Sequence, residues 1–227
     1  NRVPNRFAPE TPTVALAQGR LSWSKPEGAE KFLVLKNGAL VTTIRTPEYV
    51  VPAGPFAAYQ IIAVDEAGRE SFASEPIETG LEAATAIRSV QLETLVPKAT
   101  QAYKGYSGKG FVEITPTINR TLTIPVTVPE TGLYALDFRY ANGNGPINTN
   151  NKCAIRTLRR GSELLGTVVL PQRGVDEWSN WGFSNSILVQ LEKGTHPLTL
   201  AYEAANQNMS GEVNQAMLDY LRVKRVE

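Results

Sequence analysis

The sequence predicts an all-β protein built of two β-sandwiches, a smaller one followed by a larger one. Three observations lead to this prediction. Short runs alternate between apolar and polar residues with a period of two, which is typical of half-buried strands. Turn dipeptides separate the runs, and helical periodicity is nearly absent along the 227 residues. About fourteen strands are expected, at the spacing of roughly 8 to 12 residues that sandwiches show.

The first sandwich is expected over residues 12–78, after an extended lead-in at residues 1–11 that holds two prolines and three charges. A hairpin is predicted over residues 32–41, because Asn37 and Gly38 both tolerate positive φ at its turn. Further along, a late strand at 59–65 should be followed, within residues 66–74, by a turn and a last strand.

The strand rhythm pauses at an Ala-rich run, residues 81–87, which is the one plausible helical piece. We therefore expect a connector at 79–89 and a second domain at 90–227. Alternating strands are predicted in this second domain at 121–128, 134–140, 187–191, 198–202 and 216–223.

Composition excludes several classes of function. The chain has 23 basic and 22 acidic residues, so no strong basic field for nucleic acid is expected. No window approaches the roughly 20 apolar residues of a membrane span. One cysteine and one histidine make a zinc site of thiolates or imidazoles improbable, whereas an oxygen-ligand metal such as calcium stays open.

The chain begins at Asn1, with no Met and no apolar leader. We expect a processed chain or an excised part, whose export signal would lie outside it.

The first domain carries an early Trp23, the run Tyr59-x-Ile-x-Ala-Val-Asp-x-x-Gly68 and a closing Ser71-x-x-Ser74. With these residues it resembles a fibronectin type III domain, a Greek-key sandwich, over roughly residues 10–79. Trp23 is expected in the core. By this analogy of fold alone, the domain would have a spacer or packing role.

The second domain carries four motifs in order: Gly105-Tyr-Ser-Gly-x-Gly-Phe-Val112, Phe138-Arg-Tyr-Ala-Asn142, Trp178-x-x-Trp181 and Leu218-Asp-Tyr-Leu-x-Val223. Together they resemble the galactose-binding-like jelly roll of carbohydrate-binding modules, families 35 and 6. The resemblance implies a non-catalytic part of a larger glycoside hydrolase that degrades polysaccharide. It also implies a secreted, periplasmic or cell-surface protein.

Sugars are bound by flat aromatic rings together with amides or carboxylates that fix their orientation. Trp178 follows a polar loop, so we expect its ring to project from the sandwich rim and to contribute little to folding. One of the two tryptophans of the second domain is expected in the core. The candidate ligand-binding residues are Trp178, Tyr106, Tyr103, Asn142, Asn208 and Trp181.

The same resemblance implies a structural calcium ion. The related modules open with a Glu-x-Glu pair on the first strand and close with an Asp on the last strand. Here the opening pair is Gln91-x-Glu93 and the closing residue is Asp219. Glutamine offers a neutral carbonyl oxygen, so one charge is lost and a lower calcium affinity is expected.

Carbohydrate binding that targets an attached enzyme to its substrate is therefore the leading hypothesis. In the first alternative, the region packs on a missing catalytic domain and binds no glycan. In the second, the chain is itself a glycoside hydrolase, which needs two carboxyl groups about 5 to 9.5 Å apart. Asp176 and Glu177 are adjacent, and nothing in the sequence fixes such a pair.

Overall fold

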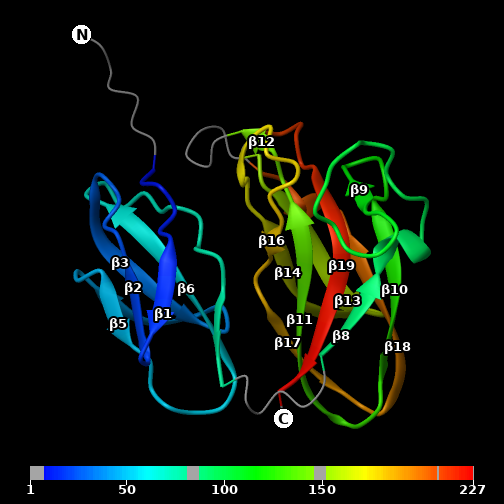
Figure 1. Cartoon of the computed structure of the whole chain (residues 1–227), viewed down its shortest axis with the longest axis horizontal. Helices are drawn as coiled ribbons and strands as arrows, with labels where there is room; N and C mark the ends of the chain where they lie inside the picture. Colours follow the sequence, from blue (N-terminus) through cyan, green and yellow to red (C-terminus); the bar gives the residue numbers. More distant parts are fainter. Residues whose placement is uncertain (1–7, 81–86, 146–151, 209, 227) are drawn as a thin grey trace.

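The computed structural model describes residues 8–80, 87–145, 152–208 and 210–226, and this part is nearly all β. Its only helical segments are two 3-10 turns, η2 (Leu92–Thr94) and η3 (Ala204–Asn206), so none could cross a membrane. Every described ladder is antiparallel, and none joins a strand before residue 80 to one after residue 87. Two sandwiches therefore stand side by side, as predicted (Figure 1).

The first sandwich packs a three-stranded sheet on a four-stranded one. The first sheet has the order β1 (Val14–Ala17), β2 (Arg20–Trp23), β5 (Glu48–Val50), and the second has β4 (Ala39–Ile44), β3 (Ala29–Lys36), β6 (Ala57–Asp65), β7 (Ile77–Thr79). Trp23 is only 6% exposed, and its ring meets Phe32 edge-on at 5.3 Å. The prediction that Trp23 is a core residue is confirmed.

The predicted hairpin around Asn37 and Gly38 is present between β3 and β4. Both residues have positive φ, 52° and 79°, so the turn needs residue types that accept the left-handed region. The Asn37 side chain also accepts a hydrogen bond from the Ala58 amide at 2.8 Å, which ties the turn to β6.

The closing strand of the first sandwich lies at 77–79 and not within 66–74 as predicted. Residues 71–74 run beside β6, but two serine hydroxyls replace part of the ladder. The Ser71 and Ser74 Oγ atoms accept the amides of Ala63 and Ile61, at 2.9 and 3.0 Å. These side-chain hydrogen bonds compete with regular strand pairing. They do not interrupt the alternation of apolar residues, so the sequence pattern does not reveal them.

The connector is shorter than expected, because Thr79 still belongs to β7 and β8 (Ile87–Gln91) already belongs to the second sandwich. The predicted helical run at 81–87 falls almost entirely outside the described residues. The same holds for residues 1–7 of the lead-in.

The second sandwich has a four-stranded and a six-stranded sheet, and it contains all five strands predicted there. The four-stranded sheet has the order β10 (Thr121–Val128), β18 (Gly194–Ala201), β13 (Ala154–Arg160), β14 (Glu163–Leu170). The other has β16 (Gly182–Phe183), β11 (Gly132–Ala141), β19 (Ala216–Arg225), β8, with β17 (Ile187–Leu191) on β11 and β9 (Val112–Ile114) on β19. A short pair, β12 (Asn144–Gly145) and β15 (Gly174–Val175), joins two loops at one end.

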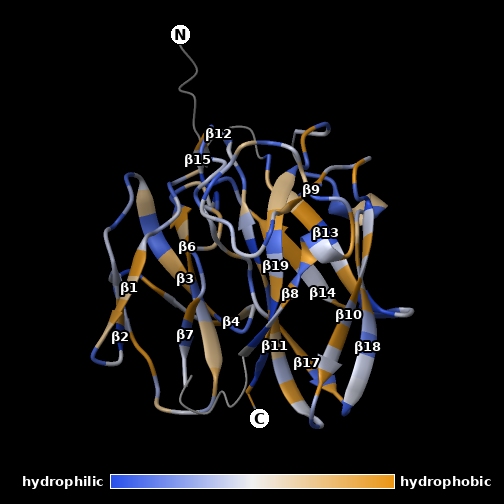
Figure 2. Cartoon of the chain, turned by 45° about the vertical axis from the view of Figure 1, so that its right-hand side comes forward, coloured by the Kyte–Doolittle hydropathy of each residue, from blue (hydrophilic) through white to orange (hydrophobic). Residues whose placement is uncertain are grey.

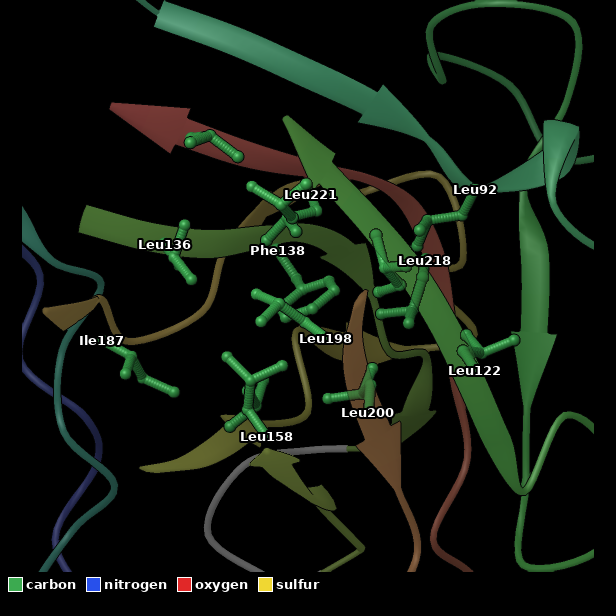
Figure 3. Packing of buried hydrophobic residues seen from close by; sticks show 14 of the residues in the cluster. Leu92, Leu122, Leu136, Phe138, Leu158, Ile187, Leu198, Leu200, Leu218 and Leu221 are labelled. Carbon is green, nitrogen blue, oxygen red and sulfur yellow. The ribbon is translucent and has the colours of Figure 1, made fainter. Parts of the chain in front are cut away.

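The core of the second sandwich lies between its two sheets. Every second side chain of a strand points into this core. Strand β10 shows this most clearly, because its residues alternate between exposed and buried from end to end. Figure 2 shows the same alternation as bands of hydropathy along the strands. The inward-facing residues include Leu122, Leu136, Phe138, Leu158, Leu198, Leu200, Leu218 and Leu221 (Figure 3). Each buried side chain of this size contributes roughly 1.5–3 kcal/mol to folding.

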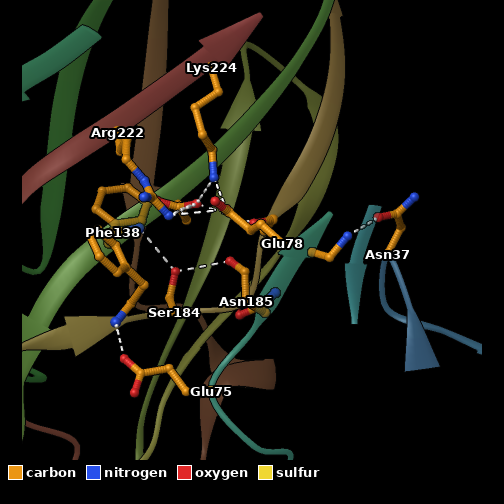
Figure 4. A network of polar contacts seen from close by, with 12 residues as sticks. Asn37, Glu75, Glu78, Phe138, Ser184, Asn185, Arg222 and Lys224 are labelled. Atoms are coloured by element: carbon orange, nitrogen blue, oxygen red, sulfur yellow. Dashed lines mark hydrogen bonds and ion pairs between the residues drawn. The ribbon is translucent and has the colours of Figure 1, made fainter. Parts of the chain in front are cut away.

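The two sandwiches also contact each other directly. Phe56 and Ala58 of the first pack on Ala135 and Val226 of the second. Beside this apolar contact, Glu78 pairs with Lys224 and Arg222 across the interface (Figure 4). The first domain is therefore docked on the outer face of the six-stranded sheet.

Candidate functional site

Aromatic side chains gather at one end of the second sandwich, where two loops meet β9. Tyr103 lies between Phe111 and Trp178 in a column of rings. The centroids are 5.8 Å and 5.7 Å apart, and the ring planes of Tyr103 and Trp178 differ by only 10°. Phe111 is 2% exposed and anchors the column in the domain. Sequence reasoning named Tyr103 and Trp178 but missed Phe111, whose apolar side chain gives no functional signal.

Trp178 does not project freely from the rim as expected. Its indole lies against the backbone of Gly143, where an added Cβ would come within 2.7 Å of the five-membered ring. With Tyr103 stacked on it, the indole is half-buried. The loop folds back because the Asp176 amide donates to the Gly143 carbonyl at 2.9 Å, with Asp176 at a φ of 58°.

Trp181 and Tyr106 complete the cluster. The Trp181 Nε1 donates to the Lys104 carbonyl at 2.7 Å, and its ring meets Phe111 edge-on. Trp181 thus fixes the loop that carries Tyr103 and Tyr106. Tyr106 leans on Phe111 but keeps 38% of its surface exposed, the largest exposed fraction in the cluster.

Polar groups surround the column. Burial, together with the nearby carboxylates of Glu113 and Asp176, raises the pKa of the Tyr103 hydroxyl. Glu113 is held in place by two amides, from Gln101 at 2.9 Å and from Gln215 at 2.6 Å. The sequence analysis did not identify Gln101, Glu113 and Gln215, because they lie far apart in the sequence and only the fold brings them together.

Asn142 needs a correction, since it is not placed to bind a ligand. Its side chain is fully buried, and its Nδ2 donates to the Leu170 carbonyl at 3.0 Å. Its Oδ1 accepts both the backbone and the side-chain amide of Asn144. An amide used in this way shapes the loop, which is the common structural role of asparagine at such positions.

Asn208 needs the same correction. Its Nδ2 donates to the carbonyls of Cys153 and Val213, at 2.6 and 2.5 Å. Its Oδ1 accepts the Ser210 amide at 3.0 Å, so the whole side chain closes a turn.

The three expected calcium ligands meet around one loop. Gln91 ends β8, and Glu93 lies in the 3-10 turn η2, so the pair does not share a strand face as expected. Even so, an added Cβ at Gly108 would lie 2.5 Å from Glu93 Oε1 and 2.8 Å from Gln91 Oε1. Asp219 accepts the Ser107 amide and hydroxyl, at 3.0 Å each. The fold therefore brings the opening and closing residues together.

The charge at this point favours only a weak cation site. Glu93 Oε2 is buried and has no hydrogen-bond partner among the described residues, which fits a metal ligand. However, Arg139 forms an ion pair with the fully buried Asp219 and donates to the Gly105 carbonyl at 3.0 Å. Within the described ranges, no group of three His, Cys, Asp or Glu side chains could hold a metal, so Gln91 would have to serve as a ligand.

No protein-family model matches the chain. The chain is similar to cycloisomaltooligosaccharide glucanotransferases of Niallia circulans. One is 31% identical over 112 residues, which are 49% of this chain and 10% of the relative. Another is 33% identical over 147 residues, which are 64% and 13%. The chain therefore spans only about an eighth or less of the length of these relatives.

Solved structures are similar over about three fifths of the chain. A Paenibacillus cycloisomaltooligosaccharide glucanotransferase in complex with cycloisomaltoheptaose is 31% identical with a TM-score of 0.47, over 59% of this chain and 18% of that one. Family 35 carbohydrate-binding modules from Cellvibrio japonicus and Clostridium thermocellum are 22% and 21% identical, each with a TM-score of 0.45. They cover 61% of this chain and 92% and 98% of their own.

Proposed function

We propose that this chain binds carbohydrate without catalysing a reaction on it. The observation that carries the proposal is the ring column of Phe111, Tyr103 and Trp178, flanked by the exposed Tyr106 and by fixed carboxylates and amides. Aromatic faces contact the apolar C–H surface of a sugar, and the polar groups set its orientation. The curated relatives support this function, because both are named as enzymes of glucan transfer.

Within this proposal, the chain is an ancillary region of a secreted enzyme that acts on polysaccharide, and it holds that enzyme on its substrate. We also propose that the first sandwich is a fibronectin type III-like domain, and its three-stranded and four-stranded sheets around Trp23 support this assignment. Catalysis is assigned to another part of the longer protein.

A calcium ion is part of the proposal as a structural ligand held by Gln91, Glu93 and Asp219. When bound, it would neutralise Glu93 and stabilise the loop of Ser107 and Gly108. That loop also carries Tyr106, so the ion would act on the aromatic cluster through the loop conformation.

The test is affinity electrophoresis of the chain against a panel of soluble polysaccharides, followed by calorimetry with cycloisomaltoheptaose. Retardation by at least one glucan, lost in Tyr103→Ala, is expected. If no polysaccharide retards the chain, the architectural alternative replaces this proposal. Release of reducing sugar by the chain alone would instead show a hydrolase.

A further inference from the structure

The loop that carries Trp178 is closed at its base by Arg173 and Asn180, which form three hydrogen bonds with each other. Arg173 Nε donates to the Asn180 carbonyl at 2.9 Å, and Asn180 Nδ2 donates to the Arg173 carbonyl at 3.0 Å. Arg173 also donates its backbone amide to the Asn142 carbonyl at 2.8 Å. These bonds hold the ends of an eight-residue segment close together.

A residue of the first domain binds this base from outside. Glu75 Oε1 accepts the Phe183 amide at 2.9 Å and lies 3.3 Å from Arg173 Nη1. The Arg173 side chain is 16% exposed, and its guanidinium lies 5.7 Å from the centre of the Tyr140 ring. The Glu75 side chain is 45% exposed, so this ion pair by itself contributes little, and the shorter hydrogen bond from the Phe183 amide holds the carboxylate in place.

The local backbone is shaped to receive this carboxylate. At Gly182, next to Phe183, an added Cβ would overlap with Glu75 Oε1 and Arg173 Nη1. Any side chain at position 182 would therefore displace the Glu75–Arg173 pair. Glu75, Arg173 and Asn180 also line a cleft of about 640 Å³ between the two sandwiches. Their polar atoms bind one another there, so this wall of the cleft serves to join the domains.

We propose that Glu75 of the first domain is a positioning residue for the carbohydrate site of the second domain. The inference rests on the proposed function above. Glu75 contacts no ring of the aromatic column. Instead, it fixes the base of the loop whose middle holds Trp178, and a loop that is already ordered loses less conformational entropy when a sugar binds. The first domain thereby takes part in recognition without touching the ligand.

The experiment compares the full chain with Glu75→Ala and Glu75→Gln. Hydrogen exchange of residues 172–183, followed by mass spectrometry, measures the order of the loop with no ligand present. Calorimetry with cycloisomaltoheptaose, or with the glucan selected by the panel, measures affinity. Alanine removes the charge and the acceptor, whereas glutamine can still accept the Phe183 amide. We expect faster exchange and roughly threefold to tenfold weaker binding in Glu75→Ala, with smaller effects in Glu75→Gln.

Glu78→Gln is the matched control, because Glu78 lies in the same interface but pairs with Arg222 and Lys224 and not with the loop. Glu78→Gln should lower the free energy of unfolding, because it removes one charge from a buried group, but well below the unfolding transition it should leave loop exchange and affinity unchanged. Gly182→Ala should reproduce the effects of Glu75→Ala from the side of the second domain.

Unchanged loop exchange or unchanged affinity in Glu75→Ala would overturn the proposal, as would equal effects in Glu75→Ala and Glu78→Gln. If the parent chain binds no glycan, the proposed function and this positioning role both fail. The exchange data would then still decide whether Glu75 orders the loop.

Discussion

Lys224 of β19 and Glu78 of β7 form an ion pair that joins the last strands of the two sandwiches. The ammonium group of Lys224 is fully buried and also lies 2.6 Å from Asp137, which is itself fully buried. Arg222 binds the same two carboxylates at 2.8 and 3.1 Å, so the four formal charges cancel. Removing one partner from such a buried group of charges destabilises the folded protein, because the remaining charges stay buried without full compensation.

The first prediction concerns this interface. Lys224→Met should lower the free energy of unfolding by about 3 kcal/mol, since it leaves Asp137 and Glu78 sharing Arg222 alone. Urea denaturation of the full chain measures the change. Lys193→Met, at an exposed lysine, is the control and should change stability by less than about 0.5 kcal/mol. Equal stability of both variants would show that the buried pair contributes nothing.

The second prediction separates the two kinds of tryptophan. Trp178→Ala should weaken glycan binding roughly tenfold to thirtyfold, because the column loses its outer ring. It should also cost about 1–3 kcal/mol of stability, since the indole is half-buried. Trp23→Ala should cost roughly 3–5 kcal/mol and leave the affinity of the folded fraction intact. Calorimetry measures the glycan affinity of both variants, and thermal melting measures their stability. Unaltered glycan binding by Trp178→Ala would show that the binding site lies elsewhere.

The third prediction concerns the surface on which Trp178 rests. Gly143→Ala places a methyl group within 2.7 Å of the indole, so the ring must move. We expect about 1–3 kcal/mol of destabilisation and weaker glycan binding. Gly54→Ala is the control, because a Cβ there meets nothing within 4 Å. Identical melting temperatures of the two variants would show that the Trp178 indole does not pack on Gly143.

The fourth prediction tests the calcium proposal. A ligand that binds only the folded state raises its stability, so calcium should raise the melting temperature and a chelator should reverse the rise. Gln91→Glu should enlarge the rise, because it adds a charged oxygen ligand beside Glu93. Glu192→Gln, at an exposed carboxylate, should respond to calcium as the parent does. A melting temperature that does not change with calcium in either the parent or Gln91→Glu would exclude the site.

The fifth prediction is a loss of stability in alkali. Burial raises the pKa of Tyr59, Tyr103, Tyr140 and Tyr220 in the folded chain. Their neutral forms are favoured by folding, so this stability is fully present below the unfolded pKa of about 10 and is lost as the pH rises through the folded values. Denaturation at pH 8 to 11.5 should show a falling free energy of unfolding above pH 10. In Tyr103→Phe the free energy of unfolding should fall less steeply with pH. An equally steep fall in that variant would contradict the raised pKa of Tyr103.

The strand framework was predictable from the sequence because alternation depends on neighbouring residues alone. Thr121–Val128 illustrates this, since every second side chain faces the core. The Asn37-Gly38 turn was predictable for the same reason, as its backbone conformation requires those residue types. The closing strand of the first domain was misplaced, because Ser71 and Ser74 bind β6 through hydroxyls that carry no periodic signal.

The residue types of the candidate site could be named from the sequence, but their roles could not. Asn142 and Asn208 have the chemistry of sugar ligands, yet their amides are fully used in closing loops. Whether a polar side chain faces solvent or backbone depends on contacts with distant segments. Trp178 likewise was expected to stand free, and only its approach to Gly143 and Tyr103 shows that it is packed.

By itself, then, the sequence determined the all-β class, most strand positions and the loops that bear the aromatic residues, because these follow from local periodicity and turn chemistry. The tertiary structure alone decided which residues meet across large separations. Asp219 meets Ser107 over 112 positions, and Glu75 meets Phe183 over 108. Such pairs form only after both sheets have closed and the sandwiches have docked, so no local pattern encodes them.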